Sequence, residues 1–284
     1  MNLAVNGTRA AIVMLCLFAC GPASAAPLTG LEPNRVRVEY LPPKNPAHQY
    51  IHDRLKERAV LERLADFLSP IRLPRELVLK LEGCDGTVNA FYGEGIASVC
   101  YEYIDYVFTL ILSAPRPAGL PPLDAVIGPT VDVFLHEAGH GAFDLLEVPV
   151  FGREEDAADQ FAAYLQLQFG REEARTLVLG NAYVGEREAK EMMAKSQTLK
   201  DYANEHGLPA QRYFNTLCLA YGYDPELFAD AMTLWNLPPE RAEYCAAEYK
   251  QLARAFEKLI HPYVDAERLA AVKTKKKLRI EVLR

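Results

Sequence analysis

Two histidines and a glutamate are spaced so that they could bind a metal ion and use it. His136, Glu137 and His140 lie in a stretch whose apolar spacing predicts a helix over residues 124–146. Residues i and i+4 share one face of a helix, so both imidazoles can reach one Zn²⁺ ion. Glu137 can then contact a zinc-bound water and act as its general base. Apolar residues flank the motif on both sides, where two bare histidines would be costly, and this favours zinc binding.

An acidic segment after this motif can supply the third protein ligand that a hydrolytic zinc site needs. It opens a predicted helix over residues 154–169, with Glu155 and Asp159 one turn apart on the same face. We expect Glu155 to bind zinc and Asp159 to accept a ring N–H from a ligand histidine. The competing explanation is that an acidic first turn only complements the helix dipole. The alternative ligands in this segment are Glu154 and Asp156.

These motifs resemble those of the gluzincin metallopeptidases, which combine a His-Glu-x-x-His helix, a second helix bearing Glu-x-x-x-Asp, and an upstream edge strand that begins Asn-Ala. The corresponding strand here begins Asn89-Ala90. The chain is more closely similar to a family of exported bacterial metallopeptidases that is classified as a domain of unknown function. Its members share a Cys, Asn-Ala-x-Tyr, Cys-Tyr-Glu, the zinc helix, Gly-Arg-Glu-Glu-Asp-x-Ala-Asp, and a later Glu-His followed by Gln-Arg and Cys. The resemblance covers residues 36–261 and implies a zincin fold of the gluzincin type.

The resemblance also assigns residues to substrate binding. Related peptidases pair the substrate backbone with the edge strand, which implies that Asn89 and Ala90 bind an extended peptide by β-augmentation. The alternative is an ordinary paired strand. Related peptidases also stabilise the oxyanion with a His or Tyr from the C-terminal half. The candidates here are His206 and Arg212, and His206 could equally be a histidine of a surface loop. The histidines expected on helix surfaces are His48, His52 and His261.

The elements around these motifs predict an α+β architecture. Val36–Tyr40 alternates like a strand, and a helix is expected from Asn45-Pro46 to residue 68. Further strands are expected over residues 76–82, 87–92 and 96–100. Beyond residue 100 the pattern is almost entirely helical, so a small N-terminal mixed sheet precedes a helical C-terminal half. One metallopeptidase domain is expected over residues 26–265, with a basic tail over residues 266–284.

The first residues of the chain have the features of an export signal. Arg9 precedes the apolar run Ala10–Ala19, and Ala23-x-Ala25 offers a small-residue cleavage site. We therefore expect residues 1–25 to be a signal peptide and the protein to be exported, periplasmic or secreted. The alternative is a lipoprotein anchored through Cys20, which Phe18 makes less favourable.

Four cysteines remain after the expected signal peptide. An even number in an oxidising compartment predicts two disulfides, and four cysteines allow three pairings. We expect local pairs, Cys84 with Cys100 and Cys218 with Cys245, because each closes a segment that looks like one supersecondary unit. The alternative is four buried thiols. No cysteine pattern in the sequence predicts a cysteine-bound metal.

Composition narrows the functional classes. The 284 residues are 50% hydrophobic and carry a net charge of −7, which argues against binding to nucleic acid or to an anionic membrane surface. The apolar run of ten residues is too short for a transmembrane helix. The sequence thus predicts an exported Zn²⁺ metallopeptidase acting on a peptide or protein substrate. Two alternatives remain: an inert zinc-stabilised binding or structural module, and a zinc hydrolase of a non-peptide amide.

Overall fold

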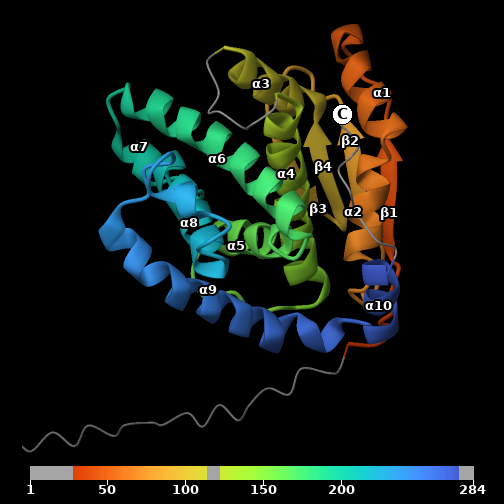
Figure 1. Ribbon diagram of the computed structural model, residues 1–284. Helices are drawn as coiled ribbons and strands as arrows, with labels where there is room; N and C mark the ends of the chain where they lie inside the picture. The colour runs from red at the N-terminus through yellow and green to blue at the C-terminus, as the bar shows by residue number, and fades with distance from the viewer. Residues whose placement is uncertain (1–27, 114–121, 275–284) are drawn as a thin grey trace, which may run out of the picture.

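A computed structural model describes residues 28–113 and 122–274 of the chain (Figure 1). The expected signal peptide, Cys20 and residues 275–284 of the basic tail lie outside the described residues. A small sheet with helices α1 and α2 occupies one side, and most of the other helices occupy the opposite side (Figure 1). The architecture is therefore α+β, as the sequence pattern predicts.

The sheet is small and mixed, and its edge strand is β3. The strand order is β1-β2-β4-β3, in which β1, β2 and β4 are parallel and β3 runs antiparallel to β4. Buried and partly exposed side chains alternate along β2, because one face of the sheet packs on the core. The strand bounds are β1 Val36–Tyr40, β2 Leu77–Glu82, β3 Ala90–Gly93 and β4 Ile96–Cys100.

Two elements of the N-terminal half differ from the sequence prediction. The helix expected up to residue 68 is divided into η1 (Pro46–His48), α1 (Gln49–Glu57) and α2 (Val60–Leu68). It breaks because Ala59 adopts a left-handed backbone with φ of 50°, which cannot continue a right-handed helix. The strand expected from residue 87 begins only at Ala90, because the preceding residues form a loop that a disulfide holds.

The C-terminal half is helical, as expected. Figure 1 shows α9 running along the base of the molecule to α10, which lies beside α2. An ion pair of 2.7 Å between Arg268 and Asp66 joins α10 to α2. No helix in the part of the chain that the structure describes is both long and apolar enough to span a membrane. The helices are α3 Tyr101–Leu112, α4 Pro122–Leu145, α5 Glu154–Gln166, α6 Arg171–Met193, α7 Leu199–Tyr202, α8 Pro209–Tyr223, α9 Pro239–Leu259 and α10 Ala266–Thr274.

Helix α4 is the central element of the fold. It contacts β2, β3 and β4 on one side and α5 and α6 on the other. Phe134 and Leu135 are fully buried in the core that α4 shares with the sheet. Gly128 lies against the α6 backbone at Leu177, where a Cβ atom would clash, so the two helices can cross closely. Helix α4, which carries the histidine motif, is therefore held between the sheet on one side and α5 and α6 on the other.

Both predicted disulfides are present. Cys84–Cys100 joins the loop after β2 to the end of β4, and Cys218–Cys245 joins α8 to α9. The Glu102 carboxylate supports the first loop by accepting hydrogen bonds of 3.0 and 3.1 Å from backbone N–H groups of residues 84 and 86. The disulfide loop leads directly into β3, and this places the edge strand next to α4.

Candidate metal centre

Helix α4 presents the histidine motif toward α5. His136 and Glu137 are only 5% and 6% exposed, and their neighbours on the helix are largely apolar. Such burial of polar side chains is stable only when they have partners. His140, one turn after His136, faces the same way, and its Nε2 atom lies 3.2 Å from Nε2 of His136.

The α5 helix supplies the third side chain of this cluster. An Oε2 atom of Glu155 lies 3.0 Å from Nε2 of His136 and 3.5 Å from Nε2 of His140. Ligand atoms of a tetrahedral zinc site with bonds of about 2.0–2.1 Å are about 3.3 Å apart. The three atoms thus form a triangle of the size that one such ion requires, with a fourth corner left for another ligand. Two imidazoles and a carboxylate are also the donor types that Zn²⁺ prefers.

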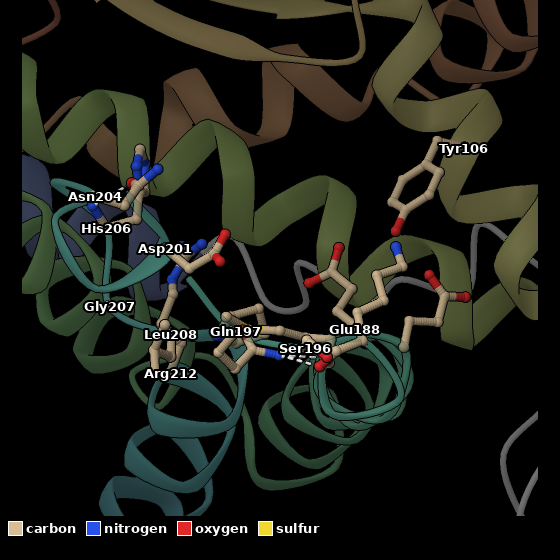
Figure 2. Close-up of a pocket in the computed structure, with 14 residues that line it drawn as sticks. Tyr106, Glu188, Ser196, Gln197, Asp201, Asn204, His206, Gly207, Leu208 and Arg212 are labelled. Atoms are coloured by element: carbon tan, nitrogen blue, oxygen red, sulfur yellow. Dashed lines mark hydrogen bonds between the residues drawn. The ribbon is translucent and has the colours of Figure 1, made fainter. Parts of the chain in front are cut away.

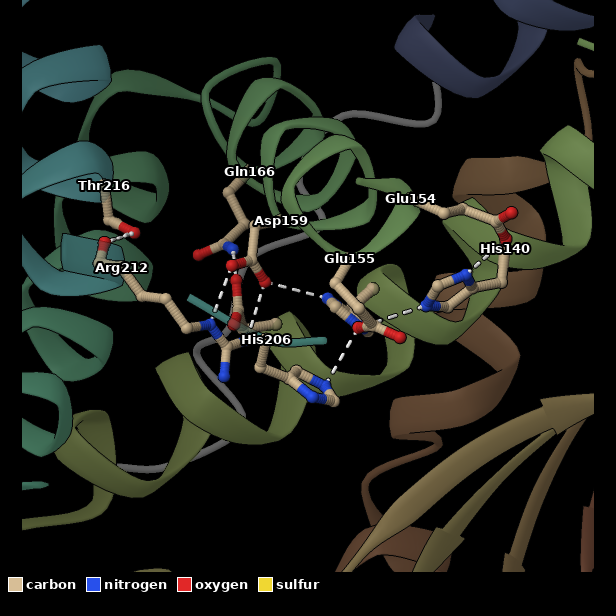
Figure 3. Close-up of polar contacts among 10 residues, drawn as sticks. His140, Glu154, Glu155, Asp159, Gln166, His206, Arg212 and Thr216 are labelled. Carbon is tan, nitrogen blue, oxygen red and sulfur yellow. Dashed lines mark hydrogen bonds and ion pairs between the residues drawn. The ribbon is translucent and has the colours of Figure 1, made fainter. Parts of the chain in front are cut away.

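Carboxylates hold the outer nitrogens of both histidines, and Figure 3 shows this contact for His140 and Glu154. Nδ1 of His136 lies 2.9 Å from Oδ1 of Asp159, and Nδ1 of His140 lies 2.7 Å from Oε1 of Glu154. When each Nδ1 donates its proton to a carboxylate, each Nε2 has a lone pair directed at the centre of the triangle. Glu154, considered from the sequence as an alternative ligand, contacts the far side of a ring instead.

The electrostatics of the cluster favour a positive charge at its centre. Burial alone would lower the pKa of His136, but hydrogen bonds to Asp159 and Glu155 raise it to about 10. The hydrogen bond to His136 lowers the pKa of Glu155 to about 2. Both shifts have the same cause. The attraction between the carboxylates and a cation that lies between them outweighs the cost of burying their charges.

Arg212 of α8 lies behind Asp159. Its Nε and Nη2 atoms donate hydrogen bonds of 2.7 and 2.6 Å to the two oxygens of the Asp159 carboxylate. Burial would raise the pKa of Asp159, yet the hydrogen bonds with His136 and Arg212 lower it below the usual range. Arg212 was expected at the substrate; the structure directs two of its nitrogens to Asp159, where they orient the partner of His136.

His206 lies at the cluster rather than on a remote surface loop. It belongs to the segment between α7 and α8, and its Nε2 atom is 2.9 Å from Oε2 of Glu155 (Figure 3). Its ring stacks with that of His136 at a centroid distance of 6.2 Å. With its side chain 41% exposed, His206 can still contact a molecule that enters from solvent.

The edge strand β3 lies beside α4. Ala90 begins β3, and Asn89 immediately precedes it and is exposed. The Asn89 carbonyl accepts a hydrogen bond of 3.2 Å from the backbone N–H of Cys100. Among the described residues β3 pairs only with β4, so its outer edge is free of other strands.

Several residues near the cluster were not predicted from the sequence. Asp132 of α4, one turn before His136, accepts a hydrogen bond from Gln166 of α5, and burial raises its pKa. Its position on the histidine face of α4 was a signal that could have identified it.

The expectation that His48 lies on a helix surface was wrong. Its side chain is 5% exposed, and its ring lies 6.1 Å from that of Tyr101, because η1 packs against α3.

A family model with the description "Putative metallopeptidase" (DUF4344) matches residues 40–260. The chain belongs to this family. The matched span includes β2, β3, β4, α4, α5 and His206, and hence every side chain of the cluster. No curated protein and no solved structure matches the chain. Membership in the metallopeptidase family indicates a metal-dependent peptidase, and His136, His140 and Glu155 are a group in the described residues whose ligand atoms lie close enough together to hold a metal ion.

Replacing Asp159 by Asn should weaken metal binding without removing a ligand. The amide cannot accept the Nδ1 proton of His136 and hold Arg212 as the carboxylate does. Loss of such an outer partner lowers metal affinity by about 10- to 100-fold. Competition for zinc with a fluorescent chelator measures this change, and Asp156→Asn, on the same helix, is the control. Equal zinc affinity in the Asp159→Asn and parent proteins would contradict the role of Asp159.

Proposed function

We propose that the chain is an exported zinc metallopeptidase that hydrolyses peptide bonds. The observation that carries this proposal is the triangle of 3.0, 3.2 and 3.5 Å among Nε2 of His136, Nε2 of His140 and Oε2 of Glu155. These three residues would hold Zn²⁺, with Asp159 and Glu154 fixing the histidine tautomers. The proposed fold is the zincin fold of the gluzincin type, which the neighbouring α4, α5 and β3 elements support.

Each residue around the metal has a distinct chemical role in this proposal. Zinc, when bound, lowers the pKa of a coordinated water toward about 7 and polarises a carbonyl group. The Glu137 carboxylate accepts a proton from the attacking water and later passes it to the leaving amine. Nε2–H of His206 donates a hydrogen bond to the oxyanion that forms as the carbonyl is attacked. Asn89 and Ala90 at the free edge of β3 bind the extended substrate backbone.

Burial supports the role of Glu137. The side chain lies between the ligand histidines in the sequence, and desolvation raises the pKa of its carboxyl above the usual value. A raised pKa makes a carboxylate a better proton acceptor near neutral pH.

The proposed export is supported by the two disulfides. Such bonds form and persist in oxidising compartments, which include the bacterial periplasm and the extracellular space. The signal peptide over residues 1–25 remains our proposal for the route, and lipidation at Cys20 is the alternative. Labelling of cells with a radioactive fatty acid distinguishes the two, since Cys20→Ala would abolish the label in a lipoprotein.

Removal of the metal tests the proposed activity. Treatment with 1,10-phenanthroline should eliminate cleavage of a quenched peptide library, and added Zn²⁺ should restore it at one ion per chain. Cleavage that survives with no bound metal would contradict the proposal. Hydrolysis of small non-peptide amides without cleavage of peptides or of denatured casein would point to a different hydrolase.

A second candidate is an inert, zinc-stabilised module, and the position of His206 favours it. Its Nε2 atom is only 2.9 Å from Oε2 of Glu155, so a small shift of the loop could bring it to the fourth corner of the metal. Four protein ligands make a closed structural site. A zinc-loaded protein that cleaves neither casein nor the library would favour this candidate.

A further inference from the structure

A large cavity adjoins the metal centre. Its volume is about 590 Å³, and it is lined by α3, α6, the segment before α8 and the first turn of α8. His206 and Arg212, which contact Glu155 and Asp159, also line this cavity. A group of the substrate that enters the cavity therefore lies beside the proposed reaction site. Figure 2 shows His206 and Arg212 on one side and Tyr106 and Glu188 on the other.

Carboxylates predominate among the charged side chains of this cavity. Glu188, Glu191 and Asp201 line it, against one lysine, Lys195. Arg212 also lines the cavity and acts to lower the pKa of Glu188, but its hydrogen bonds go to the Asp159 carboxylate, which is not part of the lining. Asp201 accepts hydrogen bonds from the backbone and side chain of Thr198. Glu188 and Glu191, one turn apart on α6, are therefore the carboxylates free to bind another group.

Glu188 is held in place at the wall of the cavity. The Tyr106 hydroxyl, from α3, interacts with its carboxylate and acts to lower its pKa. Neither Glu188 nor Glu191 forms an ion pair with another residue that the structure describes. Burial raises the pKa of Glu188, and the Arg212 charge and the Tyr106 hydroxyl act in the opposite direction without giving full compensation. A cation that entered the cavity would supply this compensation.

Apolar groups also line the cavity. Met192, Leu208 and Pro209 contribute to its wall together with the Tyr106 ring. A lysine or arginine side chain buries its methylene groups against such a surface and keeps the charged end at polar groups. The volume is comparable with that of small-molecule sites and is large enough for either side chain.

We propose that this cavity binds a cationic group of the substrate next to the scissile bond, with Glu188 and Glu191 as the recognising carboxylates. The cation is the side chain of a lysine or arginine; a free α-ammonium group has the same chemistry and is the second possible source. This inference rests on the proposed peptidase function and adds a substrate class to it. Glu188 and Glu191 act on specificity and not on the bond-breaking step.

Binding to a catalytically silent protein tests the inference without turnover. The zinc-loaded Glu137→Gln variant would be titrated with N-acetylated fluorescent peptides that differ at one position, which holds lysine, norleucine or glutamate. A fourth peptide has a free N-terminus and no lysine or arginine. We expect lysine to bind about 10-fold more tightly than norleucine, as for a charge-assisted hydrogen bond. Tighter binding of the free N-terminus than of its acetylated form would identify the α-ammonium group as the source.

Substitutions on α6 assign the effect to residues. In the Glu137→Gln background, Glu191→Gln and Glu188→Gln should each reduce the lysine preference, and Glu191→Lys should reverse it toward the glutamate peptide. Glu172→Gln, at an exposed position of α6 outside the cavity, should leave it unchanged. Because Glu191 is exposed, its substitution remains informative if Glu188→Gln does not fold.

The outcomes separate this inference from the proposed function. Equal affinity for the lysine, norleucine and free-amine peptides, in a protein whose parent cleaves peptides, would overturn the inference alone. A preference for the glutamate peptide would overturn it as well. A lysine preference that persists in a zinc-loaded parent protein unable to cleave any peptide would support the cation site and contradict the peptidase function.

Discussion

Replacing His136 by alanine should remove both the bound metal and the hydrolytic activity. The substitution deletes one of the three atoms of the triangle and leaves Asp159 and Arg212 without the ring that they orient. Loss of an outer partner already costs about 10- to 100-fold in metal affinity, so loss of a ligand should cost more. Elemental analysis of the purified variant should find far less than one zinc per chain, and peptide cleavage should fall to background.

His261 provides the matched control for this experiment. It is an exposed histidine just beyond α9, outside the cluster, so His261→Ala should keep the metal and the activity. If the His136→Ala protein retained one zinc per chain and normal cleavage, the metal would have to bind elsewhere. Thermal unfolding of both variants without zinc distinguishes loss of metal binding from loss of the fold.

Replacing Glu137 by glutamine should separate metal binding from catalysis. Glutamine has nearly the same shape, fits the same position with 6% exposure, and leaves the three proposed ligands in place. It cannot accept a proton from the attacking water, and loss of a general base lowers the rate by about 10²- to 10⁴-fold. We therefore expect one zinc per chain and a fall in kcat of that size on a quenched peptide.

The control for this substitution is Glu147→Gln, which makes the same charge change at an exposed residue just beyond α4. It should leave kcat unchanged. Hydrolysis by the Glu137→Gln protein at the rate of the parent would exclude Glu137 as the base. Loss of zinc from that protein would instead mean that Glu137 helps to hold the metal.

The sequence predicted those parts of the cluster that depend on local geometry. The i and i+4 spacing of His136 and His140 places both rings on one face whatever surrounds the helix, and the same holds for Glu155 and Asp159 on α5. The two disulfides also follow from local pairing of cysteines. The change in hydrophobic periodicity near residue 100 predicted a small mixed sheet in the N-terminal part and helices after it.

Contacts between distant segments could not be predicted in the same way. Glu154 reaches Nδ1 of His140, and Arg212 reaches Asp159, only because α4, α5 and α8 pack at particular angles. No spacing rule connects residues from three helices. The break at Ala59 was missed for a different reason: alanine is a good helix former, so its residue type gives no signal of the left-handed backbone that it adopts.

The cavity next to His206 also depends on tertiary structure. In the sequence, Glu188 and Glu191 are simply polar residues of a long helix. Tyr106 belongs to another helix that is distant in the chain. Packing of α3, α6 and α8 brings them to the wall of one cavity. A charged helix face can thus be recognised as the wall of a binding site only when the elements packed around it are known.

The metal centre can be observed most directly by crystallography of the zinc-loaded protein, with anomalous data collected on both sides of the zinc edge. We expect one zinc peak at about 2.0–2.1 Å from Nε2 of His136, Nε2 of His140 and a carboxylate oxygen of Glu155. Solvent should occupy the remaining corner. A peak elsewhere in the molecule, or His206 bound as a fourth protein ligand in place of solvent, would contradict a catalytic zinc site.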